Sequence, residues 1–207
     1  WAASRMRIAE INAGTRTVTV QGHTTGSSGW AQLKQGHRYR LENVKEALTL
    51  PGQWYLDRPS NRLTYLPKPG ETPDNTVVIA PRLPHLLLML GDAGTGQCVQ
   101  HVQFRGLTFA HAHWATPAAG QSFPQAEINL GAAIAAVGAR HITFEDCAIR
   151  HVGEYGMGFG PGCRYNRVAG CELVDLGAGG IKIGSALPGS WGDSLSAPTD
   201  DESLVSH

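Results

Sequence analysis

The sequence carries little charge, and that charge is balanced. Asp, Glu, Lys and Arg make up 16% of the 207 residues, with 17 Lys plus Arg against 17 Asp plus Glu. A chain without net charge has no overall field that would attract a phosphate backbone, so we expect no nucleic-acid partner. Long apolar runs are missing too. No apolar run, the one at residues 86–90 included, approaches the ~18 residues that a membrane helix needs, so we expect no membrane partner.

Closely spaced cysteine pairs are also absent. The four cysteines form no C-x-x-C motif, which argues against a zinc ribbon. A disulfide framework is typical of chains too small to bury a core, and a chain of 207 residues is not in that class.

Glycine, in contrast, is abundant, with 26 residues, and much of it lies in an internal repeat. Residues 142–153 recur as residues 166–177, so that Cys147 aligns with Cys171 at an offset of 24 residues. An earlier copy lies 40 residues upstream of the first, and the excess over 24 is an insertion at residues 112–130. A repeat of this length indicates an array of stacked units.

Each copy contains three short stretches of alternating apolar residues separated by glycine or polar turns. Alternate side chains of a strand share one face, so we expect Val102, Phe104, Leu107 and Phe109 to point inward. One unit cannot bury such a face alone, whereas stacked units build a continuous core. The sequence therefore predicts an all-β fold, a right-handed parallel β-helix with coils of about 24 residues.

The N-terminal part follows another pattern and predicts a small antiparallel β module over residues 1–83. We expect strands at residues 15–20 and 38–44, and a hairpin over 54–66 with its turn at 59–61. The parallel β-helix would occupy residues 84–207. The chain begins at Trp1 and ends soon after a polar run, so we expect a fragment truncated at the C-terminus. Its open last coil would then promote self-association.

Three polar residues, His111, His151 and Asp175, share one position of the repeat, at the corner after the second strand. Stacked coils would bring them into one column, about 4.8 Å apart. A carboxylate among imidazoles has its acid–base behaviour set by its neighbours, as catalytic groups require. The alternative is that these side chains only satisfy backbone groups of the turns.

The inserted segment supplies further candidates: His113, Trp114, Gln125 and Glu127. Long excursions from a compact array are commonly functional, and a Trp beside polar groups suits a sugar, which has an apolar face and polar edges. The alternative is that Trp114 covers one end of the core. Lys182, one strand after Asp175, is a further substrate-binding candidate.

Stacking also brings Cys147 beside Cys171, and the sequence leaves open whether they are free thiols or a disulfide. A metal site could be drawn from His111, His113, His151 and Asp175, but a strand corner is a poor place for it. We expect neither a metal nor a cofactor.

The chain resembles bacterial parallel β-helix glycoside hydrolases of family 141 over residues 30–184. The resemblance is carried by residues 42–47, 51–58, 63–66, 104–109, 125–127, 151–153 and 175–184. It implies a secreted or periplasmic hydrolase of plant-type glycans with α-L-fucosidase or xylanase activity, whose partner is an oligo- or polysaccharide.

The resemblance also implies two catalytic aspartates on successive coils. By motif Asp175 is one of them, and the other lies beyond residue 207. His151 is expected to assist it, Glu127 is a lesser candidate for the second carboxylate, and the predicted substrate-binding residues are His111, His113, Trp114, Gln125 and Lys182. Two other functions fit the same repeat. One is a polysaccharide lyase, which needs a base and the neutralisation of a uronate, with Lys182 and Arg150 as the candidates. The other is a non-catalytic glycan-binding or structural β-helix.

Overall fold

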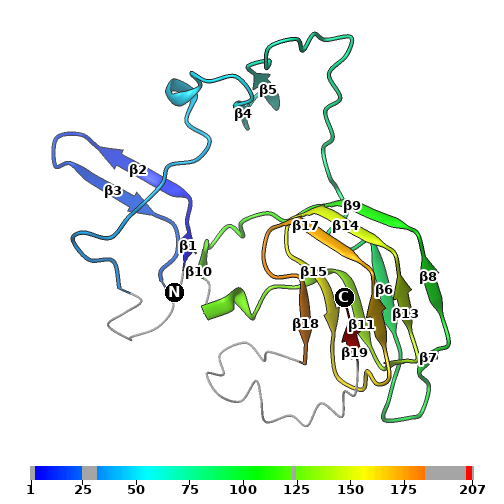
Figure 1. Cartoon of the computed structure of the whole chain (residues 1–207). Helices are drawn as coiled ribbons and strands as arrows, with labels where there is room; N and C mark the ends of the chain where they lie inside the picture. Colours follow the sequence, from blue (N-terminus) through cyan, green and yellow to red (C-terminus); the bar gives the residue numbers. More distant parts are fainter. Residues whose placement is uncertain (1–2, 25–31, 123–124, 185–203, 207) are drawn as a thin grey trace. The chain divides into compact units, whose positions relative to one another are not determined.

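The computed structural model describes residues 3–24, 32–122 and 125–184, and the backbone of residues 204–206. These residues are nearly all β, with two short 3-10 helices, η1 (Lys45–Ala47) and η2 (Gln125–Glu127). No helix in the described ranges has the length and apolar character needed to cross a membrane. The sheets are small, and parallel and antiparallel pairings both occur (Figure 1).

Two compact units make up the chain. One is Leu33–Ile79, and the other combines the described residues before and after it. The predicted division into an antiparallel module over residues 1–83 and a β-helix over residues 84–207 stays a prediction.

In the larger unit, short strands from successive repeats pair in parallel and lie side by side (Figure 1). The first sheet contains β6 (Leu87–Leu90), β11 (Ala132–Val137), β15 (Tyr155–Phe159) and β18 (Ile181–Ile183). The second contains β8 (Gln103–Arg105), β13 (Thr143–Glu145), β16 (Arg167–Ala169) and β19 (Leu204–Ser206). The third contains β9 (Thr108–Ala112), β14 (Ala148–Val152) and β17 (Glu172–Leu176), and β7 (Val99–Gln100) pairs with β12 (Ala139–Arg140).

The strand register follows the sequence repeat. Phe144 pairs with Val168 at the offset of 24 and with Phe104 at the offset of 40. Because equivalent residues meet, their side chains form columns: the rings of Phe104 and Phe144 stack at 4.8 Å, and Phe109 meets Phe144 edge to face. Phe144 is fully buried at the centre of the core. Leu107, predicted to point inward, is 47% exposed. It belongs to the first copy of the repeat, whose strands β8 and β9 lie at one end of their sheets.

The insertion between the first two copies is also paired. Its strand β10 (Gln121–Ser122) runs antiparallel to β1 (Ser4–Arg5), and η2 follows before the chain returns to β11. Near the N-terminus, β2 (Ile8–Asn12) and β3 (Thr17–Val20) form a separate antiparallel pair.

The Leu33–Ile79 unit contains the predicted hairpin, formed by β4 (Trp54–Asp57) and β5 (Arg62–Tyr65). The strand predicted at residues 38–44 is absent. The amide of Asn43 instead bonds both backbone groups of Leu56, accepting from its N–H at 2.8 Å and donating to its carbonyl at 2.9 Å. A single side chain thus takes the place that a strand partner would have.

Candidate functional site

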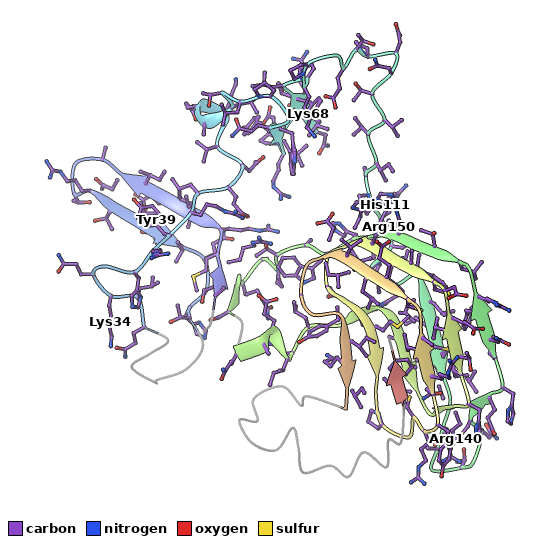
Figure 2. The ribbon with its side chains drawn as sticks, viewed as in Figure 1. Lys34, Tyr39, Lys68, His111, Arg140 and Arg150 are labelled. Atoms are coloured by element: carbon purple, nitrogen blue, oxygen red, sulfur yellow. The ribbon has the colours of Figure 1, made fainter. Side chains whose placement is uncertain are left out.

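The candidate site lies at the end of the third sheet, where each strand copy turns a corner. His111, His151 and Asp175 occupy this corner in successive copies, with φ angles of 67°, 54° and 53°. The ladder fixes their alignment, because Val152 pairs with both Ala112 and Leu176. Figure 2 labels His111 beside Arg150 at this end of the strands.

The corner residues form the column that the repeat predicts. The imidazole rings of His111 and His151 stack with their centroids 5.0 Å apart and 13° between their planes. His151 Nδ1 lies 2.6 Å from Oδ2 of Asp175. An ionised carboxylate only accepts hydrogen bonds, so the proton of this bond lies on Nδ1, and Nε2 is the nitrogen left to exchange a second proton.

His151 and Asp175 line a hollow of about 370 Å³. Its lining residues are Pro81, Ala112, His113, Trp114, His151, Val152, Gly153, Asp175, Leu176 and Gly177. Both members of the pair are accessible, since the side chains of His151 and Asp175 are 49% and 71% exposed. The hollow therefore combines an aromatic wall with an acid–base pair that solvent and a ligand can reach.

Glycine at position 153 lets Trp114 reach this wall. A Cβ on Gly153 would lie 2.5 Å from Cβ of Trp114 and 2.7 Å from its backbone nitrogen. The guanidinium of Arg5 lies 5.5 Å from the centre of the Trp114 ring, a cation–π arrangement. The residue before Trp114, His113, is held by its backbone, because its N–H donates to the carbonyl of Leu83 at 2.8 Å.

Four of the eight predicted site residues line the hollow, namely His113, Trp114, His151 and Asp175, and His111 stacks behind His151. The other three lie elsewhere. Gln125 and Glu127 belong to η2, where the charge of Glu127 adds to burial in raising the pKa of Tyr155. The ammonium of Lys182 donates to the carbonyls of Ile128 and Leu130.

Two residues that the sequence did not single out adjoin this segment. Tyr155 is buried and donates to the carbonyl of Ala126 at 2.5 Å. Burial raises the pKa of Glu154, and nearby His85 and Lys182 oppose the rise. In the next repeat copy these positions are held by Ala178 and Gly179, so the repeat pattern gave no signal for either residue.

The cysteines carry no cross-link. Cys147 and Cys171 are both free thiols, and burial raises the pKa of Cys171. Within the described ranges, no three His, Cys, Asp or Glu side chains converge in a way that would hold a metal ion.

A second, larger hollow of about 750 Å³ lies on the hairpin of the Leu33–Ile79 unit. It is lined by Lys45, Tyr55, Asp57, Ser60, Asn61, Arg62 and Thr64. It contains no His and no close acid–base pair, so we place the candidate site at the Asp175 corner despite the smaller volume there.

Comparison with known proteins agrees with this architecture at the level of fold. No protein-family model and no curated protein matches the chain. A solved structure named "Glycoside hydrolase" is similar, with a TM-score of 0.65 and 24% sequence identity, and the match covers 72% of this chain and 30% of that one. The chain therefore has a glycoside hydrolase-like fold and spans about 30% of the length of that structure.

Proposed function

We propose that this chain forms part of a glycoside hydrolase that cleaves plant-type polysaccharides, with the fucosidase-like or xylanase-like activity of family 141. In this proposal the stacked parallel strands are coils of a right-handed β-helix. The protein acts outside the cytoplasm, secreted or periplasmic, and its partner is an oligo- or polysaccharide. The fold likeness to a glycoside hydrolase and the sequence resemblance both support the proposal.

The observation that carries it is the Asp175–His151 pair beside Trp114 in one hollow. The indole face offers an apolar platform for a sugar ring, and the polar corner offers groups for its hydroxyls. Oδ2 of Asp175 is held by the imidazole, which leaves Oδ1 for the substrate. His151 fixes the orientation of the carboxylate and can exchange a proton through Nε2.

Hydrolysis of a glycosidic bond needs a second carboxyl group, about 5 Å from the first in retaining enzymes and ~6.5–9.5 Å in inverting ones. The family resemblance supports an aspartate on the coil after that of Asp175. Glu127 remains the candidate within the inserted segment, although it does not line the hollow.

The test is the Asp175→Asn variant of the complete gene product, assayed on xylan and on fucosylated oligosaccharides. We expect the natural protein to release new reducing ends and the variant to lose at least about a thousandfold in rate, with an unchanged circular dichroism spectrum. Equal rates in the two proteins would contradict the assignment of Asp175. Products that carry an unsaturated uronide would contradict hydrolysis and indicate a lyase.

A further inference from the structure

We propose that Lys182 is a positioning residue of the glycan site. It fixes the segment after η2 and, through Leu130 and Tyr155, holds Trp114 in the wall of the hollow. This inference rests on the function proposed above, because it concerns the geometry of the same site.

The segment around η2 depends on side chains for its hydrogen bonds. Ala126 and Glu127 have φ angles of 58° and 53°, so this stretch is neither a regular helix nor a ladder strand. Backbone carbonyls in such a stretch need other partners when they are covered. Tyr155 supplies one to the carbonyl of Ala126, and Lys182 supplies two, to Ile128 at 3.3 Å and to Leu130.

The residues around Lys182 leave room for its side chain and stabilise its charge. Its register partner in β15 is Gly158, which has no side chain to compete for the space. Its ammonium lies 5.2 Å from the centre of the Tyr155 ring, within cation–π range. The opposite charge comes from Glu154, whose carboxylate accepts the backbone N–H of Gly131. Burial lowers the pKa of Lys182, and the attraction to Glu154 opposes that shift.

The segment is packed directly against the aromatic wall. Leu130, Ala132 and Tyr155 are 7%, 3% and 7% exposed and form one apolar cluster, and Trp114 packs against it. Trp114 also lines the hollow that contains Asp175. Because Leu130 is held by Lys182 on one side and contributes to the support of Trp114 on the other, loss of the ammonium should let the indole move.

A direct role in substrate binding predicts something different. An ammonium that neutralises a uronate would face the sugar, whereas Lys182 points to backbone carbonyls and is not among the residues that line the hollow. The two accounts therefore differ in which ligands are affected when the charge is removed.

The experiment compares Lys182→Met, which keeps the length of the side chain, with Tyr155→Phe, which removes only the hydroxyl. Lys182→Arg serves as the conservative variant and Arg105→Met as the control, since Arg105 is 68% exposed and pairs with acidic residues of β13 and the turn that follows it. Each protein is labelled with 5-fluorotryptophan, and the Trp114 signal is assigned from Trp114→Phe. Affinities for neutral xylo-oligosaccharides and for glucuronic-acid-substituted ones are then measured by calorimetry.

We expect Lys182→Met to shift or broaden the Trp114 fluorine signal. We also expect the affinity for both oligosaccharides to fall by about tenfold, as it would on loss of one aromatic contact. Tyr155→Phe should act in the same direction, Lys182→Arg should restore most of the signal, and Arg105→Met should change nothing. An unchanged Trp114 signal in Lys182→Met, or weakening of the acidic ligand alone, would overturn the inference. If the natural protein binds neither glycan, the proposed function fails, while the fluorine spectra still decide whether Lys182 positions Trp114.

Discussion

His151 and Asp175 are hydrogen-bonded neighbours although 24 residues separate them, and the parallel ladder is the cause. Arg150 pairs with Val174 and Val152 with Leu176, so the residues between them are brought to the same corner. The candidate site is therefore a consequence of strand register. Any change that weakens the stacking of repeats should disturb the site as well.

The strongest test of the stack is Phe144→Ala. Phe144 is 0% exposed and contacts the rings of Phe104 and Phe109 from its neighbouring repeat. Truncation leaves a cavity that a close-packed core fills only in part, so we expect a loss of about 3–5 kcal/mol in the free energy of unfolding, measured by urea denaturation. Val174→Ala, at a 46% exposed position of the third sheet, is the control and should cost much less. Equal costs for the two variants would show that the repeats do not share this core.

A second prediction concerns Asn166, a buried polar side chain of the core. It is 1% exposed, its Oδ1 accepts the N–H of Ile142 at 2.9 Å, and its Nδ2 donates to the carbonyl of Ala139 at 3.0 Å. Asn166→Ala leaves both backbone groups without these bonds, at about 1–3 kcal/mol for each buried group that stays unpaired.

Asn166→Leu provides the matched comparison, because it keeps nearly the size of the side chain while removing both hydrogen bonds. Amide hydrogen exchange at Ile142 should therefore be faster than in the natural protein in both variants. Exchange at Ile142 that stays as slow in the leucine variant as in the natural protein would contradict this account of Asn166.

The sequence predicted those parts of the molecule that repeat. The offset of 24 residues gave the register of Phe144 with Val168, and with it the column that ends at Asp175, because equal spacing in parallel strands places equal positions together. The mainly β character was predicted for the same reason.

The parts of the molecule that do not repeat could not be predicted from the sequence. Residues 38–44 alternate like a strand, yet alternation gives no information on whether a partner strand is present, and Asn43 provides the bonds instead. Tyr155 and Lys182 donate hydrogen bonds to backbone carbonyls of the inserted segment. This backbone is irregular, so a periodic sequence pattern does not predict where its carbonyls lie. Trp114 and Asp175 were both found, but the sequence repeat does not show that they line one hollow, because Trp114 lies in the inserted segment, outside the repeat.

The close approach of Trp114 to the glycine at position 153 gives a third prediction. Gly153→Ala places a Cβ 2.5 Å from Cβ of Trp114 and 2.7 Å from its backbone nitrogen, so the added methyl group fits only if the backbone at Trp114 moves. We expect Trp114 to shift away, a change in its fluorine signal, and glycan affinity about tenfold lower. Gly180→Ala is the matched control, because its added Cβ would meet only the Leu173 side chain at 3.6 Å, an ordinary contact. The same affinity in both variants would contradict the view that Trp114 contacts the sugar.

Glu154 gives a prediction about pH. One of its carboxylate oxygens, Oε2, is buried without a hydrogen-bond partner in the described structure, and burial raises its pKa above the ordinary value of 4.5. Because the folded state then holds the carboxyl proton more tightly than the unfolded state does, the contribution of Glu154 to stability is greatest at acid pH. It is lost as the pH rises from about 4.5 through the raised pKa. The oppositely charged groups that face it, His85 and Lys182, reduce this effect without reversing its sign.

Glu154→Gln removes this titration while keeping the size of the side chain. We therefore expect the free energy of unfolding of the natural protein, minus that of the variant, to fall steadily between about pH 4 and pH 7, measured by urea denaturation at each pH. Subtraction removes every contribution that the two proteins share, and the interaction of Glu154 with His85 is part of the difference. A difference that rises with pH would mean that the ionised carboxylate is the favoured form in the folded protein, and that Lys182 and the Gly131 N–H outweigh burial.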